Sequence, residues 1–164
     1  MATVAERGGT LAKHWQGMTA AWILMLWFVF PAGTLAAQQA IENKILVDVG
    51  GLRSGKGQVM CALYSSADGY PTKGDKAMAY SSSAILNGHG ECNFTGMRPG
   101  KYAISVFHDE NSNGKLDSKF MGIPREGVGA SNNAKGHFGP PKFEDAAFQF
   151  PGGHLDLKIA MTYY

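Results

Sequence analysis

The stretch that decides the fold is Pro99–Asp117, which reads PGKYAISVFHDENSNGKLD. It opens on Pro99-Gly100, a turn dipeptide, because proline fixes φ and glycine tolerates positive φ. Apolar residues then alternate with small or polar ones, at Tyr102, Ile104 and Val106. This two-residue period is typical of a strand with one buried face. At Asp109 the alternation stops, so we expect a half-buried strand that runs into a polar loop.

The same alternation recurs on both sides of this stretch. It occurs in four further runs: Ile45, Val47 and Val49; Val59, Cys61 and Leu63; Cys92 and Phe94; and Leu155, Leu157, Ile159, Met161 and Tyr163. Turn signals such as Asn87-Gly88 separate the runs, and no segment has a long helical period. We therefore predict an all-β domain over residues 44–164, built as an antiparallel, immunoglobulin-like β-sandwich.

The chain has two cysteines, Cys61 and Cys92. Cys61 lies on the same strand face as Val59 and Leu63, and Cys92 lies on the same face as Phe94. Both thiols therefore point into the predicted core. In an oxidising compartment two such thiols in a small domain form a disulfide, which typically contributes ~2–4 kcal/mol. We predict a Cys61–Cys92 bridge.

The polar loop has the spacing of a calcium-binding loop. Oxygen-bearing side chains recur at every second or fourth position, at Asp109, Asn111, Asn113 and Asp117, with the Lys115 carbonyl as a further ligand. Ca²⁺ takes 6–8 oxygen ligands from such loops. The twelfth position is Phe120, where an EF-hand has a glutamate, and the flanks are strand-like. The missing ligand must come from Glu126, Glu144 or Asp145, and the alternative is a metal-free turn held by side chain-to-backbone hydrogen bonds.

Residues 109–147 form a long stretch that is rich in Gly, Asn and Pro. Loops of this length are usually functional or disordered, and the apolar residues here favour an ordered, functional loop. Its candidate binding residues are Glu126, Ser131, Asn132, Asn133, Phe138 and Phe143. The partner expected is a small molecule, a glycan or an envelope protein. Calcium is the one cofactor expected.

Two functions are compatible with this pattern. The first is a non-enzymatic binding or structural module, because binding residues concentrate on loops that a rigid framework positions. The second is a hydrolase or isomerase that uses His108 with Glu126 or Asp145 as acid and base. The second requires these side chains to converge in one place.

The N-terminus has the pattern of a secretory signal. Arg7 and Lys13 precede an apolar run, AAWILMLWFVF at residues 20–30, and small residues follow Pro31. This run is short for a bilayer span, so we predict a signal peptide over 1–37, cleaved after Ala36 or Ala37, and a short linker over 38–43. The protein would be periplasmic or secreted. The alternative is a retained leader that tethers an envelope accessory protein to the membrane.

The chain that follows the predicted leader is nearly neutral. Without Glu6, Arg7 and Lys13 it keeps 13 basic and 12 acidic residues. Nucleic-acid binding domains carry a strong positive excess, so we expect no nucleic-acid partner. The net charge likewise gives no electrostatic case for binding to an anionic membrane surface. We also expect no transmembrane segment after the leader.

The run Tyr102–Phe148 resembles the signature of a family of small exported bacterial proteins, domain of unknown function 2141. The resemblance extends over about Ile45–Tyr164 and is carried by three pieces: HDEN-x-NGKLD, GIP-x-EG and FGPP-x-FEDAAF. It implies an exported β-sandwich and no established activity, cofactor or catalytic residue. The strand PGKYAISV with its Asp/Asn turn is also similar to prealbumin-like and surface-adhesin B-type modules, in which such a turn holds calcium. Fold alone does not imply function.

Overall fold

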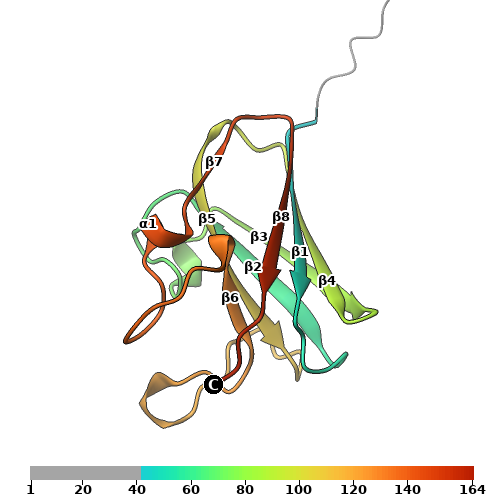
Figure 1. Ribbon diagram of the computed structural model, residues 1–164, viewed down its shortest axis with the longest axis vertical. Helices are drawn as coiled ribbons and strands as arrows, with labels where there is room; N and C mark the ends of the chain where they lie inside the picture. The colour runs from blue at the N-terminus through green and yellow to red at the C-terminus, as the bar shows by residue number, and fades with distance from the viewer. Residues whose placement is uncertain (1–41) are drawn as a thin grey trace, which may run out of the picture. The chain divides into compact units, whose positions relative to one another are not determined.

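The computed structural model describes residues 42–164, which form an all-β domain (Figure 1). The predicted signal peptide and most of the predicted linker lie outside the described residues. Eight strands occur in the described part: β1 (Lys44–Gly50), β2 (Gln58–Tyr64), β3 (Ala79–Leu86), β4 (His89–Thr95), β5 (Gly100–Asp109), β6 (Val128–Ala130), β7 (Phe148–Phe150) and β8 (His154–Ala160). The short helical turns are η1 (Gly74–Lys76), η2 (Phe120–Gly122), η3 (Ser131–Asn133) and α1 (Phe143–Ala146).

The strands follow one continuous path, β6-β5-β2-β3-β4-β1-β8, with β7 paired to β5. The two ends of the path meet where Val128 bridges Thr162, so the sheet is nearly closed and barrel-like. The all-β prediction is confirmed. The prediction of antiparallel pairing throughout is wrong for β1 and β8, which pair in parallel from Lys44 opposite His154 to Gly50 opposite Ala160. No hairpin joins these two strands, so neither is forced to run against the other.

The sheet turns over on itself at β3. Strands β2 and β4 each pair with β3, yet the Cα atoms of Cys61 and Cys92 are only 6.4 Å apart. In a flat sheet, strands on either side of a third lie about 9.5 Å apart, because neighbouring strands are ~4.8 Å apart. Gly90 permits the close approach, since a Cβ there would lie 2.5 Å from the Val59 side chain. The predicted Cys61–Cys92 disulfide is confirmed and joins β2 to β4 across this fold.

The core has the inward faces that the sequence predicts. Ile45, Val47 and Val49 of β1 are fully buried, and Val59, Cys61 and Leu63 of β2 face them. Strand β5 differs, because Ala103 is also buried on its other face. There a second apolar cluster forms between β2, β5, β6 and α1: Tyr64, Ala103, Ala130, Phe143 and Ala146. The long 109–147 segment is thus packed onto the domain through α1.

Three strands were not predicted from the sequence. Strand β3 reads AYSSSAIL and alternates between half-buried and exposed positions, but its serines hide the apolar period. Strands β6 and β7 have three residues each and lie inside or directly after the segment predicted as a loop. Among residues 42–164 no helix is long and apolar enough to cross a membrane.

Removal of the disulfide tests how much the folded-over sheet depends on it. The bridge spans 31 residues of sequence. On loop-closure entropy we expect Cys61→Ala/Cys92→Ala to lower the free energy of unfolding by about 3–4 kcal/mol. Urea denaturation of the variant, beside the wild-type domain with and without reductant, measures this. A loss below about 1 kcal/mol would show that packing alone holds β2 and β4 together.

Candidate functional site

Buried polar groups gather where β5 ends. The described residues include four buried polar or charged side chains, and three of them lie at this point: His108, Asp109 and Glu126. Charged side chains are seldom buried without specific partners. We therefore build the site from these three residues and the Asp109–Asp117 loop that they support.

Asp109 is fully buried and is held by three donors. Its Oδ1 accepts the Asn113 N–H at 2.9 Å, and its Oδ2 accepts the Gly114 N–H and the Gln58 Nε2–H, both at 2.9 Å. Burial by itself raises the pKa of Asp109, but hydrogen bonds from Gln58 and from the loop backbone outweigh it and hold the pKa below its ordinary value. The carboxylate therefore stays ionised and fixes the loop around itself.

The other oxygen-bearing side chains close the loop. The Nδ2 of Asn111 donates to Asp117 Oδ2 at 2.8 Å, and the Nδ2 of Asn113 donates to Asp117 Oδ1 at 3.4 Å. The amide oxygens of Asn111 and Asn113 accept the N–H groups two residues later, as in Asx turns. The structure thus brings together Asp109, Asn111, Asn113 and Asp117, and it does so with the hydrogen bonds of the metal-free alternative.

Glu126 folds back onto this loop. Only 4% of it is exposed. Its Oε1 accepts the Glu110 N–H and its Oε2 accepts the Asp117 N–H, both at 2.9 Å. One carboxylate therefore clamps the start and the end of the loop. Glu144 and Asp145, the other two carboxylates considered for this place, are exposed on α1.

His108 is enclosed beside the loop, and both of its ring nitrogens are occupied. Its Nε2 lies 2.8 Å from the Lys56 carbonyl and its Nδ1 lies 2.8 Å from the Tyr163 hydroxyl. A carbonyl only accepts, so Nε2 carries a proton, and in a neutral ring Nδ1 accepts from the Tyr163 hydroxyl. The Tyr163 oxygen in turn accepts the Arg53 N–H at 3.1 Å. These bonds connect β5 with the C-terminus and with the segment between β1 and β2.

An ion pair lies beside His108 at the same end of β5. The Arg53 guanidinium binds the Glu110 carboxylate through Nε at 3.1 Å and through a second nitrogen, and it lies over the Tyr163 ring. The Arg53 hydrogen bond, then the bond from Ser54 at 2.9 Å, lowers the pKa of Glu110 to about 2. Gly57 lets this segment come close, because a Cβ there would lie 1.9 Å from the Asp109 carbonyl oxygen.

Of the residues in the acid–base hypothesis, His108 and Glu126 lie at the same end of β5, and Asp145 lies apart from them on α1. His108 binds Tyr163 and Lys56, and the Glu126 carboxylate binds two backbone N–H groups. Asp145 is exposed on α1, whose last residues bind η3. Among the described residues, no hydrogen bond joins any two of these three side chains, and those of His108 and Glu126 are engaged with other groups.

Most of the predicted binding residues serve the fold. The buried Ser131 hydroxyl accepts the Ile104 N–H and donates to the Ala146 carbonyl at 2.6 Å. Asn132 donates to the Ala147 carbonyl, and Asn133 accepts the Ala160 N–H. Phe143 packs against Tyr70. Phe138, in contrast, is fully exposed.

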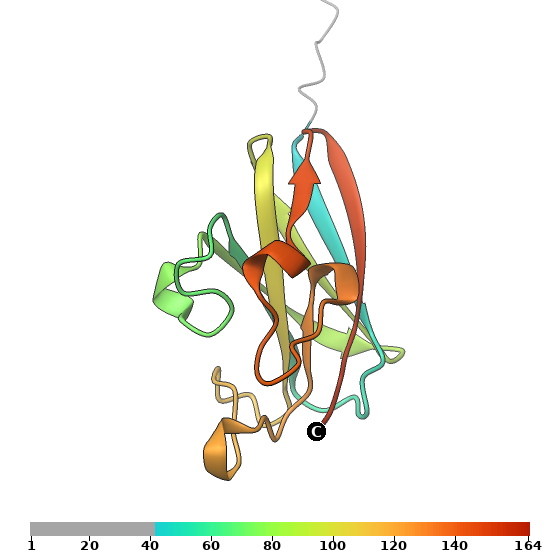
Figure 2. The ribbon, with the colours of Figure 1, turned by 60° about the vertical axis from the view of Figure 1, so that its left-hand side comes forward.

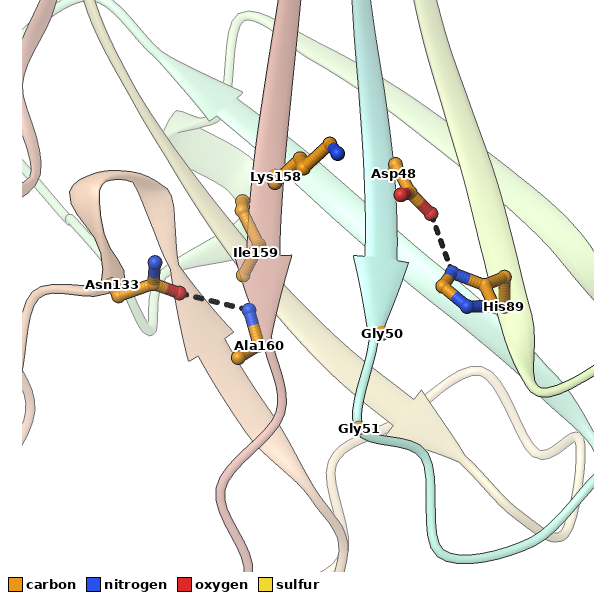
Figure 3. A pocket seen from close by; sticks show the side chains of 8 residues that line it. All are labelled: Asp48, Gly50, Gly51, His89, Asn133, Lys158, Ile159 and Ala160. Carbon is orange, nitrogen blue, oxygen red and sulfur yellow. Dashed lines mark hydrogen bonds and ion pairs between the residues drawn. The ribbon is translucent and has the colours of Figure 1, made fainter.

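A shallow, open depression lies elsewhere on the sheet, where β1 and β8 end (Figure 3). Its rim includes an Asp48–His89 pair at 2.8 Å, which sequence reasoning missed because the two residues are 41 positions apart. The pair follows from the β1–β4 register, which sets Asp48 opposite Glu91 and Gly50 near His89. Both side chains are largely exposed, and surface pairs of this kind contribute little. Neither the shape of this depression nor its charged pair indicates a function.

The Glu110–Arg53 pair makes stability depend on pH. Because the pKa of Glu110 is lowered to about 2, its contribution is complete above its unfolded pKa of about 4.5 and is lost as the pH falls towards 2. We expect Glu110→Gln to lower the free energy of unfolding by about 1 kcal/mol at neutral pH, since the exposed Arg53 is screened by solvent. The loss should shrink at about pH 3.

Denaturation curves at about pH 6 and about pH 3 measure this difference. Glu144→Gln, which removes an exposed carboxylate from α1, is the matched control and should show no such dependence. Equal pH dependence in wild type and Glu110→Gln would mean that the pair contributes nothing.

A family model described as "Uncharacterized protein conserved in bacteria (DUF2141)" matches residues 47–158, which include the strands from β2 to β7 and the whole Asp109–Glu126 region. No curated protein and no solved structure is significantly similar to the chain. The match covers well over half of the chain, so the protein belongs to the DUF2141 family of bacterial proteins.

Proposed function

We propose that this protein is an exported, non-enzymatic binding module in which calcium stabilises the Asp109–Asp117 loop. The barrel-like sheet is the scaffold, and residues 109–147 form the surface that binds the partner. The observation that carries the proposal is the gathering of four oxygen-bearing side chains around one loop whose first carboxylate is fully buried. Such a loop is ordered before any ligand arrives.

The remaining acceptor capacity of the loop supports calcium. A carboxylate has about four acceptor sites, and Asp109 uses three of them. The amide oxygens of Asn111 and Asn113 each accept one N–H and keep a second lone pair. Rotation of the two amides away from Asp117 would free its oxygens as well. Backbone carbonyls and water complete a set that suits a hard cation.

The low charge of this ligand set predicts weak binding. Asp109 and Asp117 are its two carboxylates, and within residues 42–164 no three His, Cys, Asp or Glu side chains gather as a metal site. Calcium affinity rises with the number of charged ligands, and extracellular modules bind with a Kd of about 10⁻⁴–10⁻³ M. We place this loop in that range, which suits a protein outside the cytoplasm.

Export and the finer fold class belong to the same proposal. A disulfide in the core favours an oxidising compartment such as the periplasm. The disulfide between layers and the sheet that turns over at β3 favour an immunoglobulin-like sandwich as the class of the barrel-like fold. The partner remains of the kinds that the sequence indicates: a small molecule, a glycan or a component of the envelope.

Calcium should raise the thermal stability of the domain. At about 10 mM Ca²⁺ we expect Tm to rise by about 5 °C over its value in chelator, from mass action at a Kd near 10⁻³ M. Asp117→Asn should abolish most of this rise, because it removes one of two charges from the loop and leaves Asp109 buried in place. Calorimetry with and without chelator measures the effect.

The control is Asp75→Asn, an exposed carboxylate in η1, which should keep the full calcium response. Identical melting curves of the wild type in calcium and in chelator would refute the calcium part of the proposal.

The leader should be absent from protein in its native envelope. We expect a mass that begins at Ala37 or Gln38, as cleavage after Ala36 or Ala37 produces. Intact-mass measurement on the natively exported protein checks this. A mass that retains residues 1–36 would instead identify a tethered accessory protein.

A further inference from the structure

Between Asp117 and Glu126 the chain forms a hairpin that projects from the body of the domain (Figure 2). Its stem is held by the Arg125 N–H on the Asp117 carbonyl at 2.8 Å and by the Lys119 N–H on the Ile123 carbonyl at 2.6 Å. The tip, residues 119–123, carries three apolar side chains in a row of five. Their exposed fractions are 89% for Phe120, 83% for Met121 and 47% for Ile123.

The fold does not explain these side chains. Phe120 and Met121 are almost fully exposed, so they stabilise no core. Met121 also has φ of 65°, a left-handed conformation that is unfavourable for a residue with a long side chain. A polar residue or glycine would make the same turn with less strain and better solubility. Exposed apolar groups of this kind mark a surface that meets something else.

The surroundings of the tip are basic. Lys115, Lys119 and Arg125 are exposed around the hairpin. The carboxylates of the hairpin are Glu126 and Asp117, and the amides of the loop hold Asp117. The Lys119 Nζ donates one hydrogen bond to the Tyr164 carbonyl oxygen at 3.0 Å and keeps two further donors. The loop between η3 and α1 extends towards the same end of the domain in both views (Figures 1 and 2). It carries the fully exposed Phe138 between Lys135 and Lys142. Apolar tips ringed by lysine and arginine complement an apolar phase beneath an anionic layer.

The area is small for a protein partner. Even at about 150 Å² for each side chain, a value for aromatic residues, Phe120, Met121, Ile123 and Phe138 together offer at most roughly 600 Å², and Ile123 is only 47% exposed. A stable protein interface needs about 800 Å² on each side, with a complementary surface. A narrow, convex hairpin does not present such a face, whereas a fluid lipid layer deforms around it.

We propose that the 119–123 tip docks the domain on an anionic lipid surface. Phe120 and Met121 enter the boundary between headgroups and acyl chains, while Lys115, Lys119 and Arg125 lie among the lipid phosphates. The inference deepens the proposed function, since it names the partner of the 109–147 surface. It does not need calcium, because the tip carries its own apolar and basic groups.

Co-sedimentation with vesicles tests the proposal. Residues 42–164 contain the whole core and the disulfide, so the domain is used without the leader. In chelator, we expect it to partition onto phosphatidylcholine vesicles with about one-third phosphatidylglycerol at least tenfold more strongly than onto phosphatidylcholine alone. Phe120→Ser/Met121→Ser should lower this partition at least about tenfold, since it removes both inserting side chains.

Matched variants distinguish binding through the tip from nonspecific binding through other exposed apolar or basic side chains. Leu86→Ser removes another exposed apolar side chain, 72% exposed, at the β3–β4 turn, and should bind as the wild type does. Lys119→Ser/Arg125→Ser should weaken binding to anionic vesicles about tenfold or more, whereas Arg98→Ser/Lys158→Ser removes the same charge away from the tip and should change it much less. Unchanged Tm in the tip variants shows that the fold is intact.

Three results would overturn the inference: no partition of the wild type onto anionic vesicles, equal loss in Leu86→Ser and in the tip variant, or a wild-type dimer that Phe120→Ser/Met121→Ser converts to a monomer. The last would make the tip an interface between copies of the chain. None of these results touches the calcium response, which is read from Tm without lipid. The two proposals can therefore fail separately.

Discussion

The structure around the candidate site depends on one constraint, the burial of the Asp109 carboxylate at the end of β5. An ionised carboxylate inside a protein must find donors, because leaving it unpaired costs several kcal/mol. Here the donors are the Asn113 and Gly114 N–H groups and the Gln58 side chain. The loop therefore has to curl back over the strand end, and β2 has to reach the point where Gln58 lies opposite Asp109.

The neighbouring groups extend this constraint over three distant segments. Glu126 clamps both ends of the loop through backbone N–H groups, Arg53 binds Glu110, and His108 binds Tyr163 near the C-terminus. The loop base is thus rigid, while the hairpin between Asp117 and Glu126 extends from it with its apolar tip in solvent. A rigid base with an exposed tip is an arrangement that suits contact with a surface, because little order is lost on binding.

The fold was predictable where the apolar period was clean. Ile45, Val47 and Val49, or Val59, Cys61 and Leu63, alternate so regularly that their buried face and the Cys61–Cys92 pairing follow from spacing. Strand β3 was not predictable in this way, because its serines give no hydrophobic contrast, and β6 and β7 are too short for a period to show. At the site, the spacing indicated Asp109, Asn111, Asn113 and Asp117 as a group, but Ser131, Asn132 and Asn133 proved to hold η3 and α1 in place.

The sequence by itself determined the all-β class, the inward faces of the main strands, the disulfide and the loop that follows β5. These are local properties, since a two-residue period and a turn dipeptide act through neighbouring residues. Only the tertiary structure decided the parallel pairing of β1 with β8, the fold of the sheet at β3, the clamp by Glu126 and the enclosure of His108 by Tyr163 and Lys56. Each of these joins segments far apart in the chain, and such contacts are set by how whole strands pack, which no local pattern records.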